Sequence, residues 1–291
     1  MISVIILTLN SANFIKPCLD SVLSQEAADI ELIVVDNGSR DGTAGLVKKY
    51  YPGVKLIENR LNLGACAARN QGIEASRGEW VFTLDCDVVL ERGFFGSIGG
   101  LLKGLPVEIG AVQPKILDFK GKRIYSAGIS VSFLKRFFDI GRGDKDSGRF
   151  GRNKYIFGTC CAASFYRRQM LKAIGRAGEY FDREFFFLFE DVDLAWRARK
   201  KQYKALFYPQ AVCYHRGNSS QTPDKTRQYL CLRNRYYTLL KNSSAINCAV
   251  PFLLYDLPRA FWLSLTNPSA LRAVGELFIY AEKIRGSREA S

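Results

Sequence analysis

Residues 80–87 read Trp80-Val81-Phe82-Thr83-Leu84-Asp85-Cys86-Asp87, an apolar run that ends in two carboxylates one residue apart. A short apolar run after the turn signal Arg77-Gly78 is typical of a parallel strand that is covered on both faces. Because buried acids without a partner are costly, we expect a cation beside Asp85 and Asp87. Oxygen ligands at the carboxyl end of a strand favour a divalent metal ion there. The alternative interpretation is an acidic turn in contact with water.

Three strand-and-helix units precede this strand. Their apolar patterns switch between the period of a strand and the period of a helix. The expected strands are 3–9, 31–35 and 54–57, and the helices that follow them begin at about 14, 44 and 65. Four strands that alternate with three helices imply parallel, right-handed crossovers. The sequence therefore predicts an α/β fold with a Rossmann-like, mostly parallel nucleotide-binding sheet flanked by helices.

After Glu91 the alternation gives way to strand pairs. A helix over 94–102 is followed by strand-like runs at 110–117 and 123–131. Residues 135–154 have few apolar anchors, which predicts a mobile loop and suggests a lid over a site. The remaining expected elements are a strand-like run at 155–166, helices at 168–174 and 190–201, and two short strands at 205–208 and 212–214.

Composition and charge limit the possible partners. The 291 residues are 47% hydrophobic, enough for one large core with a tail. The chain has 42 Lys and Arg and 28 Asp and Glu. Residues 1–150 hold 19 of these cations and 17 of these acids, so the second half has 23 cations against 11 acids. Nucleic acid, anionic lipid and phosphate-bearing substrates all suit this excess. Charge alone does not choose among them.

The cysteines and the N-terminus indicate a cytosolic protein. Eight cysteines without a Cys-x-x-Cys pair favour reduced, mostly buried thiols. The chain enters a predicted strand at once, and we identify no signal peptide.

Several polar residues follow the predicted strands. Residues 8–13 read Thr8-Leu9-Asn10-Ser11-Ala12-Asn13, where a nicotinamide-binding fold would place Gly-x-Gly-x-x-Gly, so a dehydrogenase is disfavoured. Asp36 ends the second strand, where an acid can bind a nucleoside, or it caps an Asx turn. Arg69 either reaches a base or diphosphate or is a solvated helix charge.

A second group of chemical residues lies beyond residue 185. Glu190, Asp191 and Asp193 open a predicted helix, where acids favour the positive end of the helix dipole. Three acids exceed what capping needs, and one in partly apolar surroundings suits a general base. His215, the single histidine, precedes a Gly/Ser loop. It is either a hydrogen-bonded structural residue or a ligand to metal or phosphate.

In this order, the motifs resemble those of family 2 glycosyltransferases with the GT-A fold, and most resemble a rhamnosyltransferase-like bacterial and archaeal subgroup. Six motifs in sequence are far more specific than one, and the resemblance covers roughly residues 1–240. The matching stretches are 3–10, Val34 to Ser39 with Asp41-Gly42-Thr43, Asn62 to Ile73, Asp85-Cys86-Asp87, Glu190 to Arg197, and His215 before Gly217.

The resemblance implies an enzyme that transfers a sugar, with inversion, from a nucleoside diphosphate sugar to a hydroxyl of a glycan or lipid-linked glycan. Nucleic acid is not an expected partner. The implied nucleotide-sugar residues are Thr8, Asn10, Asp36, Asn37, Arg69 and Asp85. The implied ligands of Mg²⁺ or Mn²⁺ are Asp85, Asp87 and His215, and the implied catalytic residues are Asp191, as general base, with Glu190.

Two departures from the family pattern leave the nucleotide base open. Asn37 replaces the second Asp of the commoner Asp-Asp pair, and many relatives have Asn-Pro-Asp in place of Asp85-Cys86-Asp87. A sugar nucleotidyltransferase is one rival, although residues 9–16 lack the Gly-rich loop that such an enzyme normally opens with. A catalytically silent sugar-binding or scaffold protein on the same fold is the other. The retained acids argue against it.

The tail predicts membrane contact. We expect the catalytic domain at 1–225 and a helical extension at 226–291, which includes the run Tyr229-Leu230-Cys231-Leu232-Arg233-Asn234-Arg235. Residues 245–265 are apolar but interrupted by Pro and charges, too short to span a bilayer. The expected arrangement is a peripheral helix on the cytosolic face of the membrane, or else a flap or dimer interface. The aromatic residues are Phe252, Tyr255, Phe261 and Trp262, and the cations facing anionic lipid are Arg259, Arg272, Lys283 and Arg285.

Overall fold

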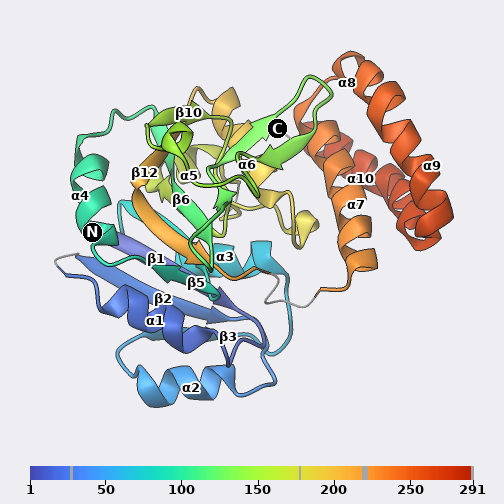
Figure 1. Cartoon of the computed structure of the whole chain (residues 1–291). Helices are drawn as coiled ribbons and strands as arrows, with labels where there is room; N and C mark the ends of the chain where they lie inside the picture. Colours follow the sequence, from blue (N-terminus) through green and yellow to red (C-terminus); the bar gives the residue numbers. More distant parts are fainter. Residues whose placement is uncertain (27–28, 177, 218–221, 290–291) are drawn as a thin grey trace.

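A ten-stranded sheet runs through the described part of the chain, residues 1–26, 29–176, 178–217 and 222–289 of a computed structural model (Figure 1). The strand order along the main path is β10-β12-β6-β11-β4-β1-β2-β3, with β5 paired to β12 and β7 to β6. The strands are β1 (Ile2–Thr8), β2 (Ile30–Asp36), β3 (Lys55–Glu58), β4 (Trp80–Asp85), β5 (Val88–Leu90), β6 (Ile109–Asp118), β7 (Ile124–Ser126), β10 (Lys154–Ile156), β11 (Ala163–Arg167) and β12 (Lys204–His215).

The directions of the strands place the polar residues of the N-terminal half at one edge. The pairs β3-β2, β2-β1 and β1-β4 are parallel, with Thr8 opposite Asp36 and Leu7 opposite Asp85. Strand β11 is antiparallel to both β4 and β6, so β6 and its parallel neighbour β12 run in the same direction as β4. The mostly parallel α/β sheet predicted from the sequence is confirmed.

Helices cover both faces of this sheet, and the alternation of side chains along β4 shows how. Phe82 points to one face and stacks on Phe165 at 4.1 Å, in the core with α1 and α4. Val81 points to the other face, in the core with α3, α5 and α6. Each helix buries an apolar stripe against the sheet. The helices are α1 (Ile15–Leu23), α2 (Thr43–Tyr50), α3 (Ala65–Glu74), α4 (Phe94–Gly104), α5 (Arg168–Ile174) and α6 (Glu190–Lys200).

Three local predictions differ from the structure. The two short strands expected at 205–208 and 212–214 are one strand, β12, with a register shift after Tyr208 where Pro209 has no N–H to donate. The run 155–166 divides between β10 and β11. The expected mobile loop at 135–154 contains β9 (Phe137–Asp139), paired with β8 (Ile129–Val131), and a short 3₁₀ helix that buries Phe150.

The C-terminal helices stand beside the sheet domain, at the right of Figure 1, and α7 packs against α6 and α10. Tyr237 of α7 stacks on Tyr280 of α10 at 3.6 Å. No helix among the described residues is both long and apolar enough to cross a bilayer. The elements are α7 (Asp224–Asn242), α8 (Ala245–Pro251), a π-helical turn (Phe252–Asp256), α9 (Leu257–Thr266), a 3₁₀ turn (Pro268–Leu271) and α10 (Arg272–Glu289).

A buried polar network joins α6 to α7. Asp193 accepts hydrogen bonds from Arg197 at 2.7 Å, Lys241 at 3.0 Å and Asn242 at 2.8 Å. Burial alone would raise the pKa of Asp193, but the charges of Arg197 and Lys241 lower it to about 2. Of the three acids in the first turn of α6, Asp193 therefore has a structural role: it joins α6 to α7.

Candidate active site

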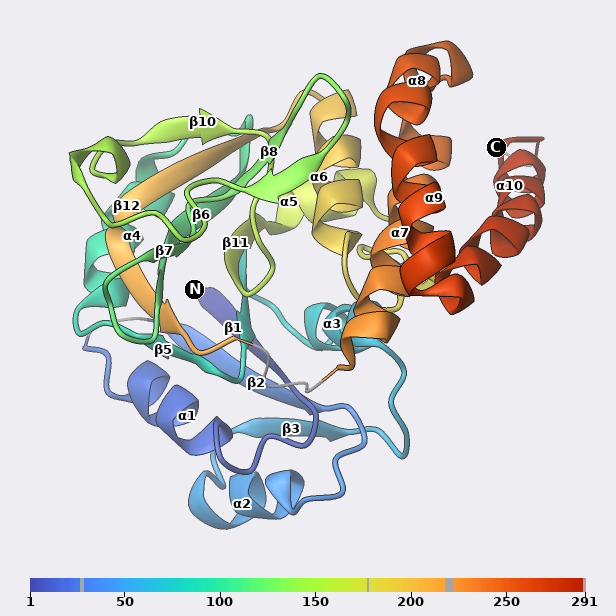
Figure 2. The same cartoon turned by 45° about the vertical axis from the view of Figure 1, so that its right-hand side comes forward.

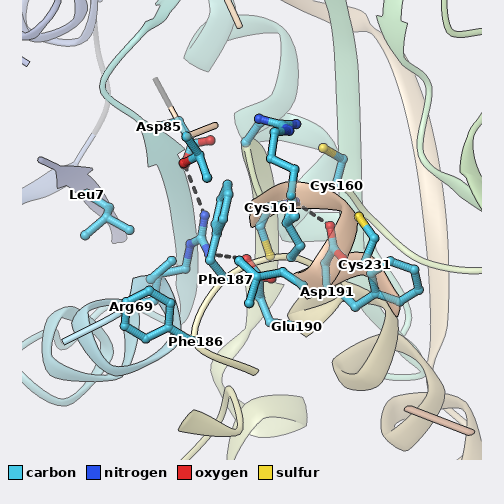
Figure 3. Close-up of a pocket in the computed structure, with 18 of the residues that line it drawn as sticks. Leu7, Arg69, Asp85, Cys160, Cys161, Phe186, Phe187, Glu190, Asp191 and Cys231 are labelled. Atoms are coloured by element: carbon cyan, nitrogen blue, oxygen red, sulfur yellow. Dashed lines mark hydrogen bonds and ion pairs between the residues drawn. The ribbon is translucent and has the colours of Figure 1, made fainter. Parts of the chain in front are cut away.

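A cavity of about 760 Å³ opens at the carboxyl edge of β1 and β4, a volume typical of sites that enclose a small ligand. Its walls come from segments far apart in the chain: the ends of β1, β2, β4 and β12, the starts of α3 and α6, the β9 arm, and α7. Figure 3 shows Arg69, Asp85, Glu190 and Asp191 together in this cavity. Its position is the one expected for a ligand site in an open α/β sheet.

Arg69 links the two sides of the cavity. Its guanidinium lies 3.1 Å from Asp85 Oδ1 and 2.6 Å from Glu190 Oε1, drawn as dashed lines in Figure 3. The Arg69 side chain is only 4% exposed, so the interpretation of Arg69 as a solvated helix charge is wrong. Burial raises the pKa of Asp85, and the positive charge of Arg69 opposes that rise. These two ion pairs fix the end of β4 relative to the start of α6.

Asp87 and His215 form a second buried pair. His215 Nε2 lies 3.0 Å from Asp87 Oδ1, and the N–H of Gly217 donates to Asp87 Oδ2 at 3.1 Å. The pairing of β5 with β12 places His215 opposite Val88, one residue beyond Asp87. The edge of the Tyr125 ring also contacts His215, with centroids 4.1 Å apart. The Gly/Ser loop predicted after His215 falls partly on residues 218–220, outside the described residues.

The residues Asp85, Asp87 and His215 suit a divalent metal ion. One ligand atom of each lies within 4.8 Å of the others. The second ring nitrogen of His215, Nδ1, is buried and makes no hydrogen bond. Two carboxylates and one imidazole are a donor set that Mn²⁺ and Mg²⁺ accept. The predicted metal ligands are therefore brought together by the fold.

Asp191 occupies the opposite side of the cavity, at the first turn of α6. Its carboxylate accepts hydrogen bonds from the N–H of Val192 at 2.8 Å and of Cys161 at 3.4 Å. Burial raises the pKa of Asp191 to about 8, and the nearby charges of Glu190 and Asp139 add to the rise. A carboxyl group with a pKa near neutrality is suited to accept a proton.

The predicted nucleoside residues are divided between the cavity and the surrounding loops. Asn37 lines the cavity, and its amide holds the following loop by donating to Asn62 Oδ1 at 2.9 Å and accepting from the N–H of Leu63 at 3.1 Å. Asp36 accepts from the N–H and hydroxyl of Ser39, at 3.0 and 2.5 Å, which is the Asx-turn alternative.

Three of the predicted residues lie just behind the cavity wall. The residues that line the cavity there are Leu7, Leu9 and Ser11, whereas Thr8, Asn10 and Asp36 are not among them. The Asn10 side chain accepts from the N–H of Arg40 at 2.8 Å. The side chains of Asn10 and Asp36 thus shape the loops beside the pocket, whereas the buried Thr8 hydroxyl makes no hydrogen bond to the described residues.

Sequence reasoning missed the wall that β9 provides. Asp139 lines the cavity and pairs with Arg142 at 3.1 Å, and the Arg142 guanidinium lies 4.1 Å from the centroid of the Tyr125 ring. No motif marks these residues, and the spacing of an acid three residues before a cation is too common to identify them. The aromatic run Phe186 to Phe189 was visible before the acids of α6 but carried no assigned role.

Comparison with known proteins agrees with this geometry. Residues 3–175 match the sequence profile described as "Glycosyl transferase family 2". The chain is 33% identical over 178 residues to a PGL/p-HBAD biosynthesis glycosyltransferase of Mycobacterium bovis, a match that covers 60% of this chain and 62% of that protein. It is 25% identical over 218 residues to the poly-beta-1,6-N-acetyl-D-glucosamine synthase of Staphylococcus epidermidis, covering 73% of this chain and 49% of that protein. The chain thus spans less than two thirds of the length of these relatives.

Solved structures share the fold at low sequence identity. One is the mannosyltransferase PcManGT of Pyrobaculum calidifontis in complex with GDP-Man and Mn²⁺, at 20% identity and TM-score 0.57, covering 97% of this chain and 75% of that chain. Another is S. aureus TarS 1–349 in complex with UDP-GlcNAc, also at 20% identity and TM-score 0.57, covering 97% of this chain and 82% of that chain. With the fold, the cavity and the profile match in agreement, this chain belongs to glycosyl transferase family 2 and has the GT-A fold.

Proposed function

We propose that the protein transfers a hexosyl or deoxyhexosyl group, with inversion, from a nucleoside diphosphate sugar to a hydroxyl group. The observation that carries the proposal is the arrangement of one cavity: a metal-type cluster on one side, a proton acceptor on the other, and Arg69 between them. Structural neighbours with GDP-Man and Mn²⁺ or with UDP-GlcNAc support the donor class.

On the donor side, we assign the nucleoside to the loops that follow β1 and β2. Asn37 faces the cavity, and its N–H donates to the main-chain carbonyl of Thr8 at 2.8 Å, while the side chains of Asn10 and Asp36 hold the backbone nearby. Asp85, Asp87 and His215 would hold a metal ion, Mg²⁺ or Mn²⁺, and the ion they bind would supply positive charge to neutralise the departing diphosphate.

On the acceptor side, Asp191 accepts the proton of the attacking hydroxyl. The acceptor oxygen forms a bond to the anomeric carbon as the bond from that carbon to the diphosphate oxygen breaks, so the configuration inverts and the diphosphate leaves with the electron pair. Burial is the main cause of the raised pKa of Asp191, and Glu190, held by Arg69 at 2.6 Å, adds to it, so that Asp191 can hold that proton.

The function is tested by nucleotide release. We expect one nucleoside diphosphate sugar to raise the melting temperature of the metal-loaded protein, because a ligand that binds only the native state stabilises it. The same donor should yield nucleoside diphosphate when acceptor is added. A sugar nucleotidyltransferase would instead form pyrophosphate from a nucleoside triphosphate, and a silent scaffold would bind donor without release. Either result contradicts the proposal.

We further propose that the acceptor is a glycan or lipid-linked glycan at the cytosolic face of a membrane, with α8 and α9 lying on anionic lipid. These helices and the π-helical turn form one rod on the side of α7 away from the sheet (Figures 1 and 2). Many apolar side chains on this rod are exposed to solvent. We name this set the apolar face: Ile246, Val250, Phe252, Leu253, Leu254, Leu257, Phe261, Trp262 and Leu265.

The charges around the apolar face favour lipid over a second copy of the chain. Asp256, the one acid of the described rod, is buried and paired with Arg235 at 2.6 Å. Two copies, each with a formal charge of +14, repel one another, whereas an anionic bilayer attracts them. A wide exposed apolar face beside cations is typical of an interfacial helix.

The cations and aromatic residues predicted to meet lipid are only partly arranged as expected. Arg272 is exposed, but Tyr255 is half-buried and its hydroxyl accepts from Arg259 at 2.9 Å, so Tyr255 faces the protein. The side chains of Lys283 and Arg285 lie outside the described residues. We therefore assign lipid contact to the apolar face, with Phe261 and Trp262 at the headgroup level.

Liposome flotation tests the membrane proposal. The variant Leu257→Ser/Phe261→Ser/Leu265→Ser should lose most binding to anionic liposomes, and high salt should weaken binding of the wild type. The matched control is Leu23→Ser/Tyr50→Ser/Val107→Ser, which removes side chains that are about equally exposed on the sheet domain. Equal binding by both variants contradicts the proposal. The proposal is also contradicted if the wild type does not bind liposomes and sediments as a dimer, while the first variant sediments as a monomer.

A further inference from the structure

Asn234, in the middle of α7, holds the turn that leads into the catalytic helix. Its side chain is fully buried, and its Nδ2 group lies within hydrogen-bond distance of three main-chain carbonyls. The distances are 2.9 Å to the oxygen of Phe185, 2.8 Å to that of Phe187 and 2.7 Å to that of Leu188. The amide of Asn234 on α7 thus holds the main chain of the segment that precedes α6.

That turn has an unusual backbone. Phe186, Leu188 and Phe189 have φ angles of 61°, 70° and 69°, in a region that non-glycine residues rarely adopt. Such conformations cost free energy and persist where the surroundings over-determine them, often at functional sites. Glu190 and Asp191 follow immediately, and the turn itself lines the cavity. The strain therefore lies directly before the proposed general base.

The opposite side of the turn touches the donor half of the cavity. The carbonyl of Phe186 accepts from the N–H of Ala65 at 2.6 Å, at the start of α3. The ring of Phe186 lies so close to Gly64 that a Cβ atom there would meet it at 2.5 Å. The turn is thus held between α3, which carries Arg69, and Asn234 of α7.

The residues on either side of Asn234 fix neighbouring segments. Arg233 donates to the carbonyls of Glu184 at 3.0 Å and Phe185 at 2.9 Å. Arg235 is buried, pairs with Asp256, and donates to the carbonyls of Leu134 and Lys135 just before β9. The sequence Arg233-Asn234-Arg235 therefore anchors two walls of the cavity.

We propose that Asn234 is a positioning residue for sugar transfer: it holds the Phe186–Phe189 turn so that Asp191 and the acceptor wall stand in register with the bound donor. This inference rests on the proposed function. The metal-type cluster and the Asn37 loop lie on other elements, so loss of Asn234 separates the chemical step from donor binding.

The test compares Asn234→Ala with Thr238→Ala. Thr238 is also buried on α7, one turn later, and its hydroxyl donates to the carbonyl of Asn234 at 2.8 Å within its own helix. For Asn234→Ala we expect kcat to fall by about 10- to 10²-fold, as for a small displacement of a catalytic group, with a raised acceptor KM. Donor affinity in Mn²⁺, measured by calorimetry, should stay close to wild type. Thr238→Ala should retain near wild-type kcat.

Hydrogen exchange gives a readout that needs no acceptor. Amides of residues 185–191 should exchange faster in Asn234→Ala and not in Thr238→Ala. Unchanged exchange or a kcat near wild type overturns the inference, as does an equal loss in both variants. If Asn234→Ala does not fold, Arg233→Met removes two bonds to Glu184 and Phe185, directly before the turn, and should show the same pattern more weakly. If the wild type releases no nucleotide, the proposed function is contradicted. The hydrogen-exchange result does not depend on turnover, so it tests the role of Asn234 separately.

Discussion

Asp191→Asn is expected to lower turnover by about 10²-fold or more, while donor binding in the presence of metal stays near normal. The amide keeps the size of the side chain and its contacts with the N–H groups of Val192 and Cys161, but it does not accept a proton. Turnover with saturating donor, together with calorimetric donor affinity, measures both parts. The control is Glu179→Gln, which neutralises a carboxylate away from the cavity.

The pH dependence that Asp191 gives the wild type has a defined sign. Because the pKa of Asp191 is raised to about 8, the free enzyme should gain kcat/KM as pH rises through that value. The raised pKa also means that Asp191 favours folding below its unfolded pKa and loses that contribution as pH rises toward about 8. Ligand-free Asp191→Asn should therefore melt at a higher temperature than wild type above pH 8. Turnover within a few-fold of wild type would remove Asp191 from the role of base.

Asp87→Ala is expected to abolish metal-dependent donor binding, whereas Cys86→Ser is expected to preserve it. Asp87 offers a carboxylate beside Asp85 and is the partner of His215 at 3.0 Å, so its loss removes one ligand and frees another. Cys86 lies between the two acids, but its thiol contacts the Ser11 hydroxyl at 3.0 Å and is a poor ligand for a hard cation.

Titration calorimetry with Mn²⁺ and the donor found by thermal screening measures this difference. Cys86→Ser is the matched control, because it changes a buried residue of the same turn without removing a carboxylate. Unchanged donor affinity in Asp87→Ala would rule out the metal assignment. A loss in both variants would mean that the turn, rather than the carboxylate, is what binding requires.

Local patterns were sufficient for the N-terminal half of the fold. The strand at β4 and the strand-helix units before it follow from periods of two and 3.6 residues, which are properties of neighbouring residues. The same reasoning divided β12 into two strands, because Pro209 interrupts the local pattern while pairing with β6 continues on both sides. A short window of sequence contains no information about which distant strand it pairs with.

Local sequence patterns also do not show which distant residues meet in the candidate site. Asp87 and His215 are 128 residues apart, and Arg69 and Glu190 are 121 apart, so family resemblance rather than local pattern brought them into one hypothesis. Asp139 and Asn234 carry no such motif. The electrostatic effect of Asp139 on Asp191 and the hydrogen bonds from Asn234 to the Phe186–Phe189 turn emerge only from tertiary structure. Asp36 was assigned to the ligand, although its carboxylate is used by Ser39.

The Arg69 bridge makes the two sides of the cavity energetically interdependent. The guanidinium of Arg69 is the shared counter-ion of Asp85 and Glu190. If either carboxylate is removed, Arg69 interacts with the remaining carboxylate alone, and the strength of that ion pair changes. Double-mutant effects at these positions will not equal the sum of the single effects. Substitutions on the two sides of the cavity are therefore best interpreted as one thermodynamic unit, with Arg69 coupling the β4 end to the α6 start.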